Sequence, residues 1–382
     1  MSEKWAETPL ISADSHIVEV PEIFAPVAKR FGKPAPRMVQ TPERGWQLDT
    51  GLGRTIPVGV FATAGMEPQT PRHDQTERAG YEARDSLTSI SARLRDMDAD
   101  GVAAEVLFPS AMGGFFAMQG ADAEVAAATF VAYNDWLADY AKESHGRMFP
   151  LACIQVHDIS AAVAEVRRAK ELGHVGIVIP CGSPDERLYL DPEYDALWAT
   201  VQELHLPVTF HSGVGASRNS TPEAFRRHGL GYTLIHLGVA VTISDLIMGG
   251  VCDRFPNITF VAAEFETGWI AHFLQRMDWR QFRREDRTKI KLRFSDYWQR
   301  NFLATFEDDE LGIRTRDVIG VETLMWASDY PHGDSVWPNS RATVERIMAD
   351  CSVEERALMT SRTVGRVFGL PELAPVAPAV RA

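Results

Sequence analysis

Short apolar runs alternate with amphipathic stretches along most of the chain, and this alternation predicts repeated strand–helix units. The apolar runs have the length of buried strands, and the amphipathic stretches have the length of helices. The predicted strands are 10–16, 103–108, 148–155, 175–179, 207–211, 258–264, 301–305 and 323–328. The predicted helices are 86–100, 122–144, 159–172, 192–205, 232–250, 268–284, 308–318 and 340–350.

Glycine and proline mark several of the predicted joints. Gly101 and Gly173 follow helical patterns as C-terminal caps, and Pro207 stands where the next strand begins. Eight strands interleaved with helices predict an α/β fold of the (β/α)8 TIM barrel type. A doubly wound open sheet is the alternative that the same pattern allows.

Two segments break the rhythm. Residues 30–85 are rich in Pro, Gly, Arg and Thr without a long periodic segment, and we interpret them as an insertion after the first strand. A solvated excursion without a role is the other interpretation of this segment. Residues 371–382 are rich in Pro and Ala and are expected to form a loose tail. We expect residues 1–382 to form a single barrel domain.

The first predicted strand ends in Asp14 and His16, which are one residue apart. Side chains at positions i and i+2 of a strand point to the same face, so this spacing directs a carboxylate and an imidazole to one point. Three later strand ends also carry metal-competent side chains: His211, Glu264 and Asp329. In a barrel, all these groups lie at the face where such enzymes build their active sites.

A divalent metal suits this set of imidazoles and carboxylates, which contains no thiolate. Asp14, His16, His211 and Asp329 could supply the protein ligands and leave a coordination position free. The structural alternative is a core histidine hydrogen-bonded to the backbone for His16 and His211, and a helix cap or turn carboxylate for Asp329.

The charge and composition of the chain exclude some classes of binding partner. The net charge of -13 without a Lys/Arg-rich run argues against nucleic acid. Cys153, Cys181, Cys252 and Cys351 lie far apart without a Cys-x-x-Cys pair, which argues against a disulfide framework. The N-terminus lacks a basic start and an apolar core, and no apolar run reaches the ~18 residues of a membrane span. We expect a cytoplasmic protein that acts on a small molecule.

The strand-end motifs resemble the amidohydrolase superfamily, in its branch related to aminocarboxymuconate-semialdehyde decarboxylase. The resemblance rests on Asp14-Ser-His16, His211-Ser-Gly, the stretch 249–269 and Ala327-Ser-Asp-Tyr-Pro-His332, and it covers roughly residues 10–370. It implies a (β/α)8 barrel with one catalytic divalent metal, Zn²⁺ or Mn²⁺. Barrels of this branch are often dimers, so the resemblance also implies a homodimer.

The resemblance assigns roles position by position. The first-strand pair, often His-x-His in the family, matches Asp14 and His16; some decarboxylases of the branch use a carboxylate there, which shifts the preference toward manganese. The fifth-strand ligand matches His211 and the eighth-strand carboxylate matches Asp329. The sixth strand often ends in a proton-handling histidine, and Glu264 stands there instead. Glu264 could be a base, a metal ligand, a residue that only fixes a neighbour, or a structural carboxylate that caps the 268–284 helix.

Three further residues are candidates for supporting roles. His236 could replace the missing imidazole as a proton carrier, or it could be a packed helical histidine. His332 could stabilise a developing negative charge or hold a substrate carboxylate, with a turn histidine as the alternative. Glu19, on the loop after the first strand, could support the ligands from behind.

Three functions fit these residues. The first expectation is a metal-dependent hydrolase in which a metal-activated water attacks a small organic substrate, with Asp329 or Glu264 as base and His236 or His332 assisting the leaving group. The second is a metal-dependent non-oxidative decarboxylase of an aromatic or muconate-type acid, with Asp329 protonating the carbon. The third is a catalytically inactive barrel that only binds.

Overall fold

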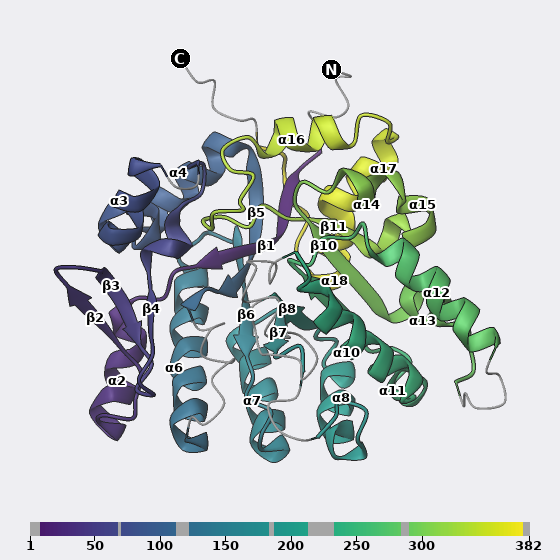
Figure 1. The fold of residues 1–382 in the computed structure, drawn as a ribbon, viewed down its shortest axis with the longest axis horizontal. Coiled ribbons are helices and arrows are strands. Elements are labelled where there is room, and N and C mark those ends of the chain that lie inside the picture. Colours follow the sequence, from purple (N-terminus) through teal and green to yellow (C-terminus); the bar gives the residue numbers. More distant parts are fainter. Residues whose placement is uncertain are drawn as a thin grey trace.

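The predicted strands form an eight-stranded parallel sheet in the computed structural model of the chain (Figure 1). The structure describes residues 8–67, 70–111, 122–182, 187–212, 233–283 and 290–376. The strands are β1 (Leu10–Ile17), β5 (Val102–Pro109), β6 (Met148–Cys153), β7 (Gly176–Ile179), β8 (Val208–His211), β9 (Phe260–Ala263), β10 (Phe302–Phe306) and β11 (Leu324–Trp326). Every strand expected from the apolar runs is therefore confirmed.

The strand order decides between the two predicted architectures. The order β1-β5-β6-β7-β8-β9-β10-β11 follows the chain without the reversal that defines a doubly wound sheet. The sheet closes on itself because His16 N donates to Tyr330 O at 2.7 Å and Asp329 N donates to Asp14 O at 3.0 Å. The (β/α)8 barrel is confirmed, and the open-sheet alternative is wrong.

Helices surround the barrel (Figure 1). The helices are α2 (Pro21–Phe31), α3 (Pro71–Ala79), α4 (Ile90–Asp100), α6 (Ala123–Lys142), α7 (Ile159–Leu172), α8 (Asp195–Glu203), α10 (His236–Met248), α11 (Val251–Arg254), α12 (Ile270–Phe282), α13 (Phe294–Asn301), α14 (Glu310–Arg314), α15 (Arg316–Ile319), α16 (Ser340–Ile347), α17 (Val353–Ala357) and α18 (Thr363–Phe368). Residues 232 and 284, the predicted first residue of α10 and last of α12, lie outside the described ranges.

The local sequence explains where α7 begins and ends. The Asp158 side chain accepts a hydrogen bond from Ala161 N at the first turn, and Gly173 adopts a left-handed conformation with φ 99° after the last turn. Aspartate at the N-cap and glycine after the C-terminus are the residues that these two positions favour. The predicted bounds 159–172 are confirmed.

The 30–85 segment contains regular structure that the sequence pattern did not reveal. Strands β2 (Arg37–Thr41), β3 (Gly45–Asp49) and β4 (Thr55–Pro57) form an antiparallel sheet, and α3 follows them. Each strand has five residues or fewer, and β2 and β4 have no fully buried residue. Without a buried face there is no strong alternation of apolar and polar positions to detect.

The barrel interior and the inner faces of the helices form one large hydrophobic core. Phe210, Phe260 and Phe302 stack in sequence across neighbouring strands, with ring centroids 5.8 and 5.2 Å apart. Among the described residues, no helix combines the length and the hydropathy needed to cross a bilayer. Of the predicted tail, residues 371–376 carry no regular structure, and residues 377–382 lie outside the described ranges.

Candidate metal centre

The structure brings together the five strand-end residues singled out in the sequence. One ligand atom from each of Asp14, His16, His211 and Glu264 lies within 4.8 Å of the others. His16 Nε2 lies 3.4 Å from Asp14 Oδ1 and 3.3 Å from Asp329 Oδ1, which adds the end of β11 to the group. All five residues are buried, so the cluster lies inside the carboxyl-end opening of the barrel and not on its rim.

Backbone carbonyls orient both imidazoles. His16 Nδ1 lies 2.8 Å from Pro109 O, and His211 Nδ1 lies 2.7 Å from Ser212 O. A carbonyl oxygen only accepts hydrogen bonds, so the proton of each neutral imidazole is on Nδ1 and the lone pair is on Nε2. Both Nε2 atoms face the carboxylates, with His211 Nε2 only 3.0 Å from Glu264 Oε2. This is the tautomer that a metal-binding histidine requires.

Two of the carboxylates stand on strained backbone. Glu264 has φ 59° and Asp329 has φ 52°, in the left-handed region that non-glycine residues rarely adopt. Glu264 N donates to Thr305 Oγ1 at 2.9 Å, and Asp329 N donates to Asp14 O at 3.0 Å. Strain of this kind concentrates at functional sites, where the surrounding structure holds a side chain in a required direction.

The polar atoms of the cluster fit a divalent cation. In the described part of the chain, both carboxylate oxygens of Asp14, both of Asp329 and the Nε2 atoms of His16 and His211 are buried without a conventional hydrogen bond. Buried polar atoms normally have partners, so this many without one at a single place points to a ligand. Imidazole nitrogen and carboxylate oxygen are donors suited to Mn²⁺ or Zn²⁺.

The pKa shifts within the cluster also favour a bound cation. Burial alone would raise the pKa of the Asp14 and Glu264 carboxyl groups, but His211 and His16 hold both below their ordinary values. Burial alone would lower the pKa of the two imidazoles, yet the carboxylates raise that of His16 well above its usual range and that of His211 to about 10. The carboxylates therefore favour positive charge at the centre of the cluster.

His332 and Glu19 belong to the wall of this centre. The His332 ring stacks on His16 with centroids 3.7 Å apart, its Nδ1 lies 3.1 Å from Asp329 Oδ1, and its Nε2 lies 2.8 Å from Ser110 Oγ. The Glu19 carboxylate accepts hydrogen bonds from Ser110 N and Ala111 N at 2.9 and 2.8 Å. Glu19 thus holds the turn that orients His332. Pro109, the residue just before this turn, orients His16.

Glu264 does not cap the following helix, so the capping alternative is wrong. Its Oε1 accepts from Ser212 Oγ at 2.7 Å, and its Oε2 lies among the imidazoles. Asp309 performs the structural task instead, because its Oδ2 accepts from Thr267 N and Gly268 N at 2.6 Å just before α12. A positive φ at Glu264 turns its side chain back to the barrel axis, which sequence spacing does not indicate.

His236 lies apart from both groups of possible ligands. It is the first residue of α10, and its ring stacks on Trp269 with centroids 5.5 Å apart. Partial burial lowers the pKa of its imidazole. Neither described group of metal-competent side chains includes it. These contacts match the packed helical histidine better than the proton carrier.

Three buried or partly buried charged residues near the centre were not singled out in the sequence. Burial raises the pKa of Glu266 to about 7, with the charge of Asp309 adding to the shift, and burial raises that of Glu307 well above its ordinary value. Both follow strand ends, which is the signal that could have identified them. Arg93 lies in the middle of α4, where an arginine normally indicates a solvent-facing position, yet it is 2% exposed.

Comparisons with known proteins agree with the fold. A family model described as Amidohydrolase matches residues 44–370. Decarboxylase orsB of Emericella nidulans is 26% identical over 217 residues, a match that spans 52% of this chain and 63% of that relative.

Solved structures with this fold include enzymes with bound manganese. Amidohydrolase map2389c from Mycobacterium avium subsp. paratuberculosis K-10 superposes with a TM-score of 0.75 at 18% identity, covering 95% of this chain and 99% of that one. The 5-carboxyvanillate decarboxylase of Novosphingobium aromaticivorans, complexed with manganese and 4-hydroxy-3-methoxy-5-nitrobenzoic acid, superposes with a TM-score of 0.70 at 20% identity, covering 97% and 98%.

Proposed function

The chain belongs to the amidohydrolase family, and from that premise we propose that it is a metal-dependent decarboxylase of an aromatic acid. The observation that carries the proposal is the buried group of Asp14, His16, His211 and Asp329, with a carboxylate at the first position. Relatives named as decarboxylases support this reaction over hydrolysis, the reaction expected first from the sequence.

We assign the cation to Asp14, His16, His211 and Asp329, with Glu264 Oε2 close enough to contribute a fifth donor. When bound, a divalent cation supplies the positive charge that holds an anionic carboxylate and a neighbouring oxygen of the substrate. Three carboxylates beside two imidazoles make a harder donor set than an all-histidine site, which favours Mn²⁺ over Zn²⁺.

We assign the handling of the proton in this reaction to Asp329 and His332. In a non-oxidative decarboxylation the bond between the ring carbon and the carboxylate carbon breaks, CO₂ leaves, and the electron pair on the ring carbon takes a proton. Asp329 Oδ1 lies 3.1 Å from His332 Nδ1, a distance over which a proton can pass. His332 Nε2 contacts Ser110 Oγ at 2.8 Å, which keeps the ring in this orientation.

The measurement of CO₂ release tests the proposal. Manganese-loaded enzyme is incubated with a panel of hydroxybenzoates, methoxy-hydroxybenzoates and muconates, and separately with esters, amides and lactones. We expect CO₂ from at least one aromatic acid, abolished by Asp329→Asn and strongly reduced by His332→Gln. His145→Gln, at an exposed histidine outside the centre, is the matched control and should keep full activity.

Two results would overturn the proposal in different ways. Turnover of esters or amides with no CO₂ from any acid would assign the enzyme to hydrolysis, the other reaction that these donors can support. Less than a tenth of an equivalent of manganese, zinc or iron after metal supplementation would instead favour the inactive barrel. Elemental analysis of the same preparation distinguishes the two.

A further inference from the structure

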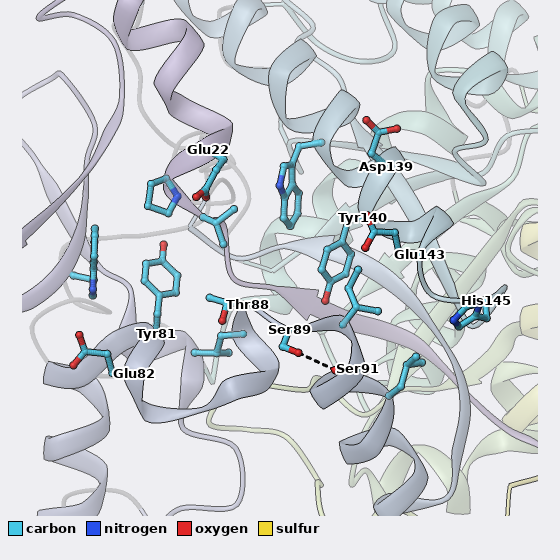
Figure 2. A pocket seen from close by; sticks show the side chains of 17 residues that line it. Glu22, Tyr81, Glu82, Thr88, Ser89, Ser91, Asp139, Tyr140, Glu143 and His145 are labelled. Carbon is cyan, nitrogen blue, oxygen red and sulfur yellow. Dashed lines mark hydrogen bonds between the residues drawn. The ribbon is translucent and has the colours of Figure 1, made fainter.

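A pocket on the flank of the barrel is lined by none of the residues of the metal centre (Figure 2). It has a volume of about 980 Å³. Its walls come from the insertion, the start of α2, the first turn of α4 and the last turns of α6. The 30–85 insertion therefore completes a cavity that the barrel alone would not have.

Two pairs of aromatic side chains form opposite walls of this flank pocket. Trp46 and Tyr81 meet edge to face with ring centroids 5.3 Å apart, and Trp136 and Tyr140 stack with centroids 5.0 Å apart. The Tyr81 hydroxyl donates to Glu19 O, which fixes the ring that the insertion presents. Aromatic faces carry negative potential, so rings arranged in this way attract organic cations and pack against methylene groups.

The charged residues of the flank pocket are acidic. Glu22, Glu82, Asp139 and Glu143 line it together with His145, and no lysine or arginine does. Asp139 pairs with Lys142 at 2.8 Å, whereas Glu22, Glu82 and Glu143 form no ion pair within the described ranges. Three carboxylates at the pocket therefore have no ion-pair partner among the described residues.

The Tyr140 hydroxyl adds a polar group that has no hydrogen-bond partner in the described part of the chain. Its ring stacks on Trp136. Figure 2 shows Tyr140 directed into the pocket between Glu143 and Ser89. Burial raises the pKa of this phenol, so the hydroxyl stays protonated. A hydroxyl placed in this way can accept a hydrogen bond from an ammonium group.

We propose that the flank pocket binds a linear oligoamine, in which several ammonium groups are separated by short methylene chains. The carboxylates are distributed around the pocket (Figure 2), and none belongs to a described group compact enough to hold a metal ion. Separated charges on the protein match separated charges on the ligand, and the methylene chains pack on the aromatic walls. The proposal does not depend on the reaction at the metal centre.

Isothermal titration with spermidine at low ionic strength tests this site. We expect saturable binding at one site per chain that weakens as salt is added, because the carboxylates are solvent-exposed and screened. The double variant Glu22→Gln/Glu143→Gln should weaken binding about tenfold, and Trp136→Leu should weaken it as well. The control double variant Glu171→Gln/Asp317→Asn makes the same change in net charge at exposed positions that do not line the pocket, and should bind normally.

The same titration with other ligands tests the chemical specificity of the site independently. Butylamine should bind more weakly than spermidine, and 1,4-butanediol should not bind. Non-saturable heat, or equal affinity in the flank-pocket and control double variants, would overturn the proposal. Circular dichroism of each variant excludes misfolding as the cause of lost binding, and Tyr140→Phe removes the hydroxyl alone.

Discussion

The barrel is held together differently at the β8/β9 boundary and at the β1/β11 boundary. Strands β8 and β9 pair in a regular parallel ladder from Val208–Phe260 to His211–Ala263. Strands β1 and β11, both fully described, share no ladder pairs, and residues 328–330 just past β11 make the contacts instead. Ser328 N donates to Ser12 Oγ at 2.9 Å, beside the two backbone bonds of His16 and Asp329.

The β1/β11 boundary also carries three of the four proposed metal ligands. Asp14, His16 and Asp329 are themselves the residues whose backbone closes the barrel there. At β8/β9 the ladder closes the sheet independently of the His211 side chain. Barrel closure and ligand geometry are therefore coupled at the β1/β11 boundary and separate at the β8/β9 boundary.

The Arg93 side chain contributes to this coupling between barrel closure and ligand geometry. Its guanidinium donates to His16 O at 2.7 Å and to Tyr330 O at 3.3 Å, so one side chain joins the two sides of the β1/β11 boundary. It also pairs with the buried Glu105 of β5 at 2.9 Å and lies over the Tyr330 ring at 4.5 Å. The first carbonyl belongs to the proposed ligand His16, and the second belongs to Tyr330, the neighbour of the proposed ligand Asp329.

The largest expected effect comes from Asp329→Asn. The substitution keeps the shape of the side chain but removes a charge that both metal binding and proton transfer would use. We expect CO₂ release to fall at least about a thousandfold, roughly 4 kcal/mol of barrier, together with reduced manganese content. Steady-state kinetics and elemental analysis measure the two effects. Full activity with a full equivalent of manganese would remove Asp329 from the site.

The next effect tests the coupling directly. Arg93→Met leaves Glu105 buried without its partner and removes the bridge between His16 and Tyr330, so we expect a loss of about 3 kcal/mol of unfolding free energy. Urea unfolding of metal-free protein measures this loss. Manganese affinity should fall as well, about tenfold or more, because the spacing of His16 and Asp329 is no longer fixed.

Arg147→Met is the matched control for that variant. Arg147 also donates to two backbone carbonyls of the barrel, Ala103 O at 2.9 Å and Val102 O at 2.8 Å, but at the opposite end of β5. We expect a loss of about 1 kcal/mol and unchanged manganese affinity. Equal effects of the two variants on manganese affinity would show that Arg93 acts only on stability.

The same contrast explains how far the sequence predicted the molecule. Strand ends were predictable because apolar runs and their terminal Asp, His and Glu residues are local patterns. Arg93 was not, because its burial depends on Glu105, His16 and Tyr330, which come together only when the barrel closes. The direction of Glu264 was not predictable either, because it depends on a positive φ stabilised by Thr305.

A smaller effect is expected away from the β1/β11 boundary, where the strands pair in regular ladders. The pH dependence of the unfolding free energy tests it. Burial lowers the pKa of His174, which precedes β7, to about 4, and its Nε2 lies 3.0 Å from Asn134 O. Between that value and the unfolded pKa of about 6.5, the unfolded chain binds more protons, so stability falls as pH decreases through this window. The stability that His174 contributes should fall by about 2 kcal/mol from pH 8 to pH 5.

The difference in unfolding free energy between the wild type and His174→Gln isolates this contribution. Other titrating groups, including His16 and His211 with their raised pKa values, occur in both proteins and cancel. A difference that stays constant from pH 8 to pH 5 would show that His174 is not buried as a neutral imidazole. Manganese affinity at pH 8 should be the same in both proteins.

The smallest effect is expected from Ile177→Val in the middle of β7. The Ile177 side chain is fully buried, and its backbone pairs with Val208 in the parallel ladder between β7 and β8. Removing one methylene from a packed core costs about 1 kcal/mol. Through this ladder Ile177 does not reach a proposed ligand at the β1/β11 boundary. Manganese affinity and kcat should therefore not change. A loss of manganese affinity as large as that of Arg93→Met would mean that the two boundaries respond as one unit, and the contrast between them would fail.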